Sequence, residues 1–180
     1  ADSDGGGLWF DNSIVTILNS TITANTASGA GGGLGMRADP TNKTLTIHNT
    51  ILAGNTATSD ADFTAPTTPA TNLDVKSSLI GTNAGTTLAA AASADANGNL
   101  IGTPAALLDP KLGPLSLNGG TTQTHALLAD SPAINAGSDS LVDSTQINDQ
   151  RGAPFGRKNG VVDIGAYELR VLDPSFFIVT

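Results

Sequence analysis

The residues that first suggest chemistry are two pairs of acids, Asp2 with Asp4 and Asp60 with Asp62. Glycosidases use two carboxylates about 5 to 9.5 Å apart, and alternate residues of a strand share one face at a spacing of about 7 Å. Both pairs, however, fall in terminal or turn-like sequence and not on a regular strand. We therefore expect solvated loop acids, and the sequence predicts no catalytic residue.

Metal binding is the next chemistry to test. The segment Asp95-Ala96-Asn97-Gly98-Asn99 has oxygen-bearing side chains at alternate positions, but it lacks the bidentate Glu and most of the charge of a calcium loop. The segment that begins at Asp2 is equally incomplete. We expect turns at both places and predict neither a metal nor a cofactor. The chain has no Cys, so thiolate chemistry and disulfides are excluded.

Charge and composition exclude several classes of protein. The chain has 180 residues, a net charge of -8 and only 4% aromatic residues. An acidic surface is a poor partner for nucleic acid, and no apolar run is long enough to span a membrane. More than half of the residues are Ala, Gly, Thr, Ser or Asn, with a single Glu, so long helices are not expected. Small polar residues mixed with Ile, Leu and Val favour a β-rich fold with tight turns.

The first half of the chain contains a repeat. Gly5-Gly6-Gly7-Leu8 recurs as Gly31-Gly32-Gly33-Leu34, and an alternating stretch follows each triplet. The first stretch begins at Val15, the second at Leu45 and a degenerate third at Leu73. Asn99–Gly102 is interpreted as a fragment of a fourth copy. One copy of about 30 residues is too small to bury its apolar face alone, so the copies must stack.

This pattern predicts an all-β fold, a short right-handed parallel β-helix, over residues 1–103. A β-sandwich with coincidental Gly-rich turns is the alternative. Stacked coils lie about 4.8 Å apart, so equivalent Asn side chains are expected to form ladders of amide hydrogen bonds. The predicted ladders are Asn19 over Asn49, and Asn25 over Asn55 over Asn83. His48 aligns with Leu18 and Lys76 in the neighbouring copies, so we expect a surface or corner histidine.

The second half carries five ordered motifs. They are Leu115…Asn118-Gly119-Gly120, Thr124-His125-Ala126-Leu127-Leu128, Ser131-Pro132-Ala133-Ile134-Asn135-Ala136-Gly137, Asp149-Gln150-Arg151-Gly152 and Asp163-Ile164-Gly165-Ala166-Tyr167-Glu168. Together with the Asn-Ser-Thr-Ile and Gly-Asn-Thr-Ala phrases of the coils, this series resembles the choice-of-anchor Q domain family. The resemblance implies a secreted bacterial protein with a right-handed parallel β-helix, related to pectate-lyase-like or polymorphic outer membrane protein-like repeats. It implies no shared activity.

We expect residues 104–168 to form an irregular C-terminal cap of the same domain. His125 is predicted to hydrogen-bond the backbone there. Arg151 is predicted to form a buried ion pair with Asp149 and Asp163 that ties down the cap, with Tyr167 and Glu168 packed beside it. The Ala-rich segment 88–96 is predicted to form one or two helical turns over a coil end.

The ends of a solenoid leave unpaired backbone groups that need a partner. The chain enters its first coil almost at once, so we expect either upstream coils of a longer chain or a second copy at that end. Residues 169–180 form a tail, and Phe176, Phe177, Ile178 and Val179 are a candidate assembly strand with high β-propensity and no charge. A head-to-tail contact of this kind propagates into a filament.

The sequence therefore predicts a non-enzymatic structural or adhesion module, extracellular or attached to the cell surface. Its expected partner is either itself or the upstream coils of a longer chain, and neither nucleic acid nor a membrane span is expected. The alternative is a carbohydrate-active or carbohydrate-binding β-helix, similar to polysaccharide lyases. Trp9, Phe10 and Tyr167 are too few and too scattered for a clear sugar-binding platform. Ice binding is disfavoured because the Thr-x-Thr pairs lie at non-equivalent positions.

Overall fold

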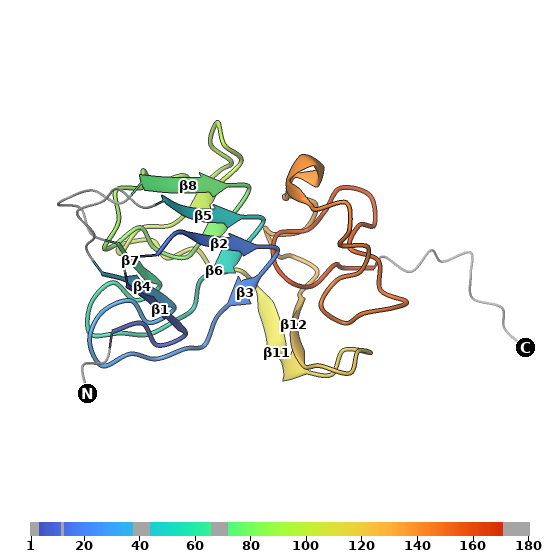
Figure 1. The fold of residues 1–180 in the computed structure, drawn as a ribbon, viewed down its shortest axis with the longest axis horizontal. Coiled ribbons are helices and arrows are strands. Elements are labelled where there is room, and N and C mark those ends of the chain that lie inside the picture. Colours follow the sequence, from blue (N-terminus) through green and yellow to red (C-terminus); the bar gives the residue numbers. More distant parts are fainter. Residues whose placement is uncertain (1–3, 12, 38–43, 66–71, 171–180) are drawn as a thin grey trace, which may run out of the picture.

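The structure, a computed structural model, describes residues 4–11, 13–37, 44–65 and 72–170. The described part is all-β apart from one short 3-10 helix, η1 (Asp139–Leu141). Figure 1 shows two parts side by side: stacked coils built from the first half of the chain, and an irregular C-terminal region next to them.

Each of the first three coils contributes one strand to each of three parallel sheets. The sheets have the strand orders β1-β4-β7, β2-β5-β8 and β3-β6-β9-β10. The predicted parallel β-solenoid is confirmed, and the β-sandwich alternative is excluded because equivalent strands of successive coils pair in parallel. The strands are β1 (Leu8–Phe10), β2 (Val15–Leu18), β3 (Thr21–Ile22), β4 (Leu34–Met36), β5 (Thr44–His48), β6 (Ile51–Leu52), β7 (Phe63–Thr64), β8 (Asn72–Lys76), β9 (Leu79–Ile80) and β10 (Leu100–Ile101).

The strand register follows the sequence repeat. Ile17 of β2 pairs with Ile47 of β5, and Ile47 pairs with Val75 of β8. Leu100 of β10 pairs with Leu79 of β9, so the predicted fragment of a fourth copy adds one more rung. Leu45 and Ile47 are fully buried between half-buried neighbours, because successive side chains of a strand point to opposite faces. Because of this alternation, every coil directs its alternate apolar side chains into the interior of the solenoid.

Residues 84–108 cover the end of the solenoid that follows the third coil. Ala65 N donates to Gly85 O at 2.9 Å, and Ser77 N donates to Asn97 O at 2.9 Å. The helical turns predicted for residues 88–96 are wrong. Ala91 forms an antiparallel bridge with Ile101 and packs on the core, because an extended segment can satisfy the backbone of the last rung and a helix cannot.

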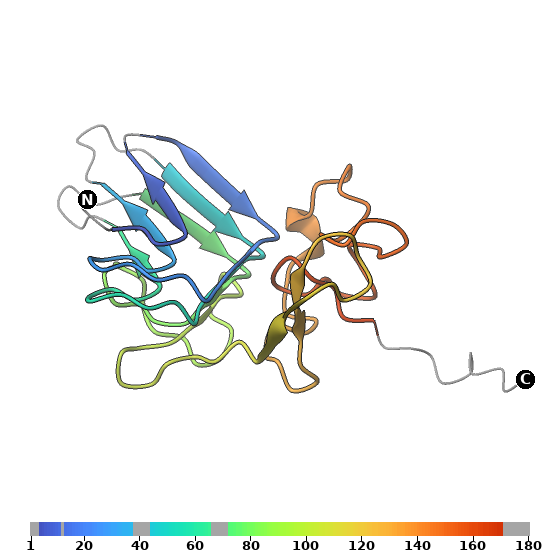
Figure 2. The same cartoon turned by 90° about the horizontal axis from the view of Figure 1, so that it is seen from below.

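The C-terminal region packs against the side of the coils. It contains an antiparallel pair, β11 (Leu112–Ser116) and β12 (Thr124–Leu127), and long irregular segments. Gly165 N donates to Asn49 O at 2.9 Å. Figure 2 shows this region beside the ends of the long strands of the coils, and not over the stack. One apolar cluster contains Ile51 of the coils and Ile164 of this region, which joins the two parts.

Most of the predicted tail, including the candidate assembly strand Phe176, Phe177, Ile178 and Val179, lies outside the described residues. Within the described residues, the structure contains no helix with the length and apolar character needed to cross a membrane.

Candidate functional site: the open coil end and the C-terminal polar cluster

The corner after β2, β5 and β8 repeats an unusual backbone conformation. Asn19, Asn49 and Ser77 stand on successive rungs with φ of 46°, 47° and 46°. Asn adopts this left-handed region more readily than most residues, because its short side chain bonds locally. The repeated Asn at this corner therefore reflects a turn that every coil must make.

The amide ladder predicted between Asn19 and Asn49 is replaced by bonds to the C-terminal region. The Asn49 amide pairs with the backbone of Ser138: Nδ2 donates to Ser138 O at 3.0 Å, and Oδ1 accepts from Ser138 N at 2.8 Å. Asn19 Nδ2 donates to Gln146 Oε1 at 2.8 Å. The Oδ1 atom of Asn19 is buried and accepts no hydrogen bond. The corner thus fixes the C-terminal region. Asn49 uses both its amide nitrogen and its amide oxygen for this contact, whereas Asn19 uses only its nitrogen.

The second predicted ladder is present for one rung. Asn25 Nδ2 donates to Asn55 Oδ1 at 3.0 Å, and Asn25 N donates to the same oxygen at 3.1 Å. Asn55 Nδ2 then donates to Asp62 Oδ1 at 3.0 Å, while Asn83 Nδ2 donates to Leu88 O at 3.0 Å. The expected bond from Asn55 to Asn83 is therefore replaced, because a buried carboxylate offers the stronger acceptor.

Asp62 was expected to be a solvated loop acid, and this prediction is wrong. It is 3% exposed, and its Oδ1 also accepts from Asn55 N at 2.9 Å. Burial raises the pKa of the Asp62 carboxyl, and the hydrogen bonds from Asn55 and Thr82 oppose this effect. Asp60 accepts from Thr64 Oγ1 at 3.1 Å. Both acids bond to the coil, and Asp2 lies outside the described residues.

The suspected calcium turn is an ordinary turn. Asp95 Oδ1 accepts from Asn97 N at 2.7 Å and from Asn99 N at 2.9 Å, so the carboxylate is used on backbone amides. Across the described residues, no group of three or more His, Cys, Asp or Glu side chains is placed to hold a metal.

The two histidines have different partners. His48 lies on the outer face of β5, where its Nε2 is 3.1 Å from Asp74 Oδ2 of the next rung. Lys76 Nζ lies 2.8 Å from Asp74 Oδ1 and, with His48, holds the pKa of Asp74 below its ordinary value. His125 Nδ1 donates to Gly113 O at 2.8 Å across the β11–β12 pair. The backbone bond predicted for His125 is confirmed.

Arg151 forms the predicted buried pair with Asp149. Its Nη2 lies 2.6 Å from Asp149 Oδ2 and 2.7 Å from Glu168 O. The guanidinium lies 3.8 Å from the centre of the Tyr167 ring and 4.0 Å from that of Phe155. Planar stacking of this kind suits Arg and is not available to Lys. The Asp149 pair and the Tyr167 packing are confirmed.

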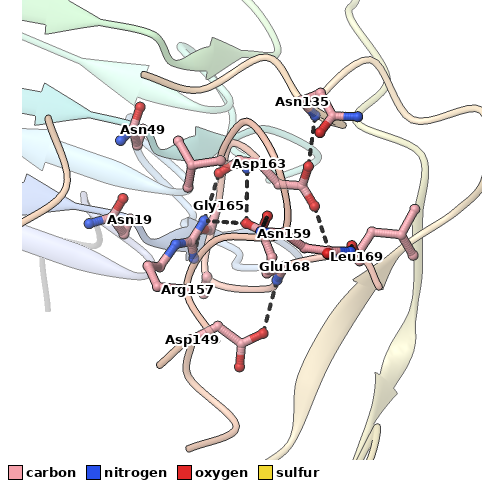
Figure 3. Close-up of polar contacts among 12 residues, drawn as sticks. Asn19, Asn49, Asn135, Asp149, Arg157, Asn159, Asp163, Gly165, Glu168 and Leu169 are labelled. Atoms are coloured by element: carbon pink, nitrogen blue, oxygen red, sulfur yellow. Dashed lines mark hydrogen bonds and ion pairs between the residues drawn. The ribbon is translucent and has the colours of Figure 1, made fainter. Parts of the chain in front are cut away.

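Asp163 has other partners than the predicted Arg151. Its Oδ1 accepts from Asn135 N at 2.7 Å, and its backbone carbonyl accepts from Arg157 Nη2 at 2.7 Å. Arg157 is 1% exposed and also donates to Gly165 O at 2.9 Å (Figure 3). Arg157 escaped the sequence analysis because it stands in a Gly- and Pro-rich segment with no apolar periodicity around it.

Glu168, the chain's single Glu, lies at the centre of these contacts. Oε2 accepts from Asp163 N at 3.0 Å and is 3.4 Å from Arg157 Nη2, and Oε1 accepts from Asn159 N at 2.8 Å. Burial raises the pKa of the Glu168 carboxyl to about 7. We call Asp149, Arg151, Arg157, Asp163 and Glu168 the C-terminal polar cluster. Its members are between 1% and 6% exposed, so their side chains are shielded from solvent.

The first coil leaves one end of the solenoid open. β1, β2 and β3 are each the last strand of their sheet, so one edge of each pairs with no strand of the described chain. A groove of about 420 Å³ lies at this end, between the first coil and the C-terminal region. Its lining combines inward apolar side chains, such as Leu8 and Ile17, with polar ones, such as Asn19 and Gln146. We call the three free edges and this groove the open end.

No family model, no curated protein and no solved structure matches the chain. The resemblance to the choice-of-anchor Q domain family rests on the motifs alone and stays a prediction. The chain itself donates hydrogen bonds to each of its buried carboxylates, which belong to Asp62, Asp149, Asp163 and Glu168. This arrangement favours a structural role for these four acids.

Proposed function

We propose that the protein is a non-enzymatic structural module, extracellular or attached to the cell surface, that assembles with other copies through the open end. The observation that carries this proposal is the contrast between the two ends of the solenoid. Residues 84–108 accept hydrogen bonds from Ala65 N, Ser77 N and Asn83 N at the last rung, whereas the outer edges of β1, β2 and β3 pair with no strand of the described chain and lie beside a groove lined by apolar and polar side chains. Free strand edges are templates for pairing with another chain.

The groove offers both kinds of contact that an added strand needs. Leu8 and Ile17 give an apolar surface, and the buried Oδ1 of Asn19 is an acceptor without a donor. A backbone N–H would satisfy it, as Ser138 N satisfies the equivalent atom of Asn49. A strand added to a sheet edge is held by main-chain bonds of this kind.

The tail of a second copy is the partner that we propose. The segment Ser175–Thr180 carries no ionisable side chain and is rich in Phe, Ile and Val, the residue types that favour strands. The tail and the open end are different surfaces. A growing assembly therefore always keeps a free tail at one end and a free open end at the other. The contact is heterologous and extends into a filament. Support for export comes from the resemblance of the C-terminal motifs.

Light scattering across a concentration series, with electron microscopy of the same samples, tests this function. The full chain is expected to form species whose mass grows with concentration. A chain that ends at Arg170 and a Leu18→Lys variant are expected to stay monomeric, because Leu18 lies on the edge strand β2 and a Lys there blocks pairing.

The matched control is His48→Lys. Position 48 is the equivalent of Leu18 one rung up, in the central strand β5, which already has a partner on both sides. This variant is expected to assemble like the parent. A full-length protein that remains a monodisperse monomer at high concentration contradicts the proposal.

A further inference from the structure

A second groove, of about 470 Å³, runs along the outside of the coils across several rungs. The first rung contributes Asp4 and Trp9, the second Ala30 and the third Asp60 and Thr64. This groove shares no lining residue with the groove at the open end, although its Trp9 also belongs to the edge strand β1.

Trp9 is the chain's only Trp and is 43% exposed. It stands in register with Gly35 of β4, and a Cβ at that Gly would lie 2.5 Å from the indole Cε3 atom. The indole therefore rests on the neighbouring rung, where Gly leaves room for it. A large aromatic side chain that is held in place but half exposed offers contact area with little further loss of conformational freedom.

Within the described part of the chain, the two carboxylates in the groove are bonded to neutral groups. Asp4 Oδ1 accepts from Ala30 N at 2.7 Å, and Asp60 Oδ2 accepts from Thr64 Oγ1 at 3.1 Å. Among the described residues, no Lys, Arg or His lies within ion-pair distance of either acid. Other acids of the chain do form ion pairs with such a residue: Asp11, Asp74, Asp109, Asp130, Asp139, Asp149 and Glu168.

These features select the charge of a ligand. The ionisable side chains of the lining are both acids, which accept hydrogen bonds and donate none. An anionic ligand is repelled, and a neutral one gains nothing from the unpaired charge. A cation is attracted by the carboxylates and by the π-face of an indole, and the two effects add.

We propose that this groove binds an alkylammonium or guanidinium group, such as the side chain of a Lys or an Arg, beside the carboxylates of Asp4 and Asp60 and against the indole of Trp9. This proposal does not rest on assembly at the open end. The cation can belong to a peptide segment or to a free amine, since both present the same charged group.

Fluorescence of Trp9 provides the test, because no other Trp contributes to the signal. The chain is titrated at low salt with Nα-acetyllysine methylamide, with the tripeptide acetyl-Gly-Lys-Gly amide and with butylamine. We expect saturable changes with these cations and none with the uncharged Nα-acetylnorleucine methylamide. Tighter binding of the tripeptide than of butylamine supports the proposal with a peptide source, and equal binding supports it with a free amine.

The double variant Asp4→Asn/Asp60→Asn is expected to raise Kd about tenfold or more, since it removes both charges and keeps an oxygen acceptor at each position. The control, Asp109→Asn/Asp130→Asn, removes two exposed charges outside the groove, where the side chains are 65% and 72% exposed. It is expected to change Kd by less than about twofold. Urea unfolding checks that each variant is folded, and single variants replace a double variant that is not.

Three results overturn the proposal. The first is the absence of a saturable response to any of the cations. The second is equal weakening by the two double variants, which would assign the attraction to net charge alone. The third is a saturable response to a neutral oligosaccharide without a response to the cations, which would assign the groove to sugars.

Discussion

The stacked coils and the C-terminal region bury their polar groups in different ways. In the coils, each rung satisfies the backbone of the next, and the interior is filled by aliphatic side chains such as Leu45 and Ile47. In the C-terminal region, strands are few, and buried guanidinium groups donate to backbone carbonyls, as Arg157 does to Asp163 and Gly165.

The difference shows what a regular fold makes unnecessary. A repeated coil needs no buried Arg or Lys to serve its backbone, because the parallel ladder already pairs its N–H and C=O groups, and its buried carboxylate, Asp62, accepts from Asn55. An irregular segment has no ladder, so its buried carbonyls need other donors. One Arg with five N–H groups can serve several carbonyls at once. The cost is a buried charge that needs a counter-ion, here Glu168.

The largest effect is expected from Arg157→Met. This change leaves the Glu168 carboxylate without its cation and removes the donor of two buried carbonyls. We expect a loss of about 3–5 kcal/mol in the free energy of unfolding, measured by urea titration. The control is Lys158→Met, which breaks an exposed ion pair with Asp139 and is expected to cost less than about 1 kcal/mol. Equal losses for the two variants would contradict the structural role of Arg157.

Ile47→Ala probes the coils. The side chain is fully buried in the middle rung, between Ile17 and Val75. We expect a loss of about 2–5 kcal/mol from the lost transfer free energy and the remaining cavity. Ile14→Ala, at a side chain that is 73% exposed, is expected to change stability by less than about 0.5 kcal/mol. If both variants unfold at the same urea concentration, the core assignment is wrong.

The pH dependence of the free energy of unfolding probes the C-terminal region through Glu168. Glu168 titrates near 4.5 in the unfolded chain and at about 7 in the folded protein. The folded state binds this proton more tightly, so the contribution of Glu168 to stability is fully present below pH 4.5 and is lost as the pH rises through 7. At 1.36 kcal/mol per pKa unit, the difference is about 3 kcal/mol.

Urea titrations from pH 4.5 to 7.5 measure this slope, and Glu168→Gln is expected to remove most of it. Asp62 and Asp163 also have pKa values raised by burial, so they add to the slope in the same direction. Exposed acids with lowered pKa values, such as Asp139, act in the opposite direction and below their ordinary pKa of 3.8. A slope that is unchanged in the Gln variant would show that Glu168 is not the group that titrates.

The smallest expected effect concerns the amide ladder. Asn55→Ala removes the donor to buried Asp62 and the acceptor for Asn25, and we expect a loss of about 1–3 kcal/mol. Asn83→Ala removes one partly buried bond to Leu88 O and is expected to cost about 1 kcal/mol or less. Thermal unfolding of both variants checks this order, and a reversed order would show that the ladder does not depend on Asn55.

Much of the fold could be predicted because it is periodic. The apolar alternation from Leu45 to Ile47 and the Gly triplets recur at the coil period, and the parallel pairing follows from stacking. Prediction was weaker where a residue's partner is distant in sequence. Asp62 looked like a loop acid because no local pattern shows that Asn55 folds over it. Arg157 escaped the sequence analysis for the same reason, since its partners Asp163, Gly165 and Glu168 follow no local pattern.

The sequence by itself determined the coil, its period and the positions of its corners, because hydrophobic alternation and turn chemistry act over a few residues. The pairing of Arg151 with Asp149 was also readable, since the two are neighbours in one motif. Only the tertiary structure decided which side of the solenoid the C-terminal region covers and which end residues 84–108 cover. The tertiary structure also showed that the amides of Asn19 and Asn49 bond to the C-terminal region and not to each other. The physical reason is that these contacts depend on the mutual placement of two packed parts, and no local sequence pattern encodes that placement.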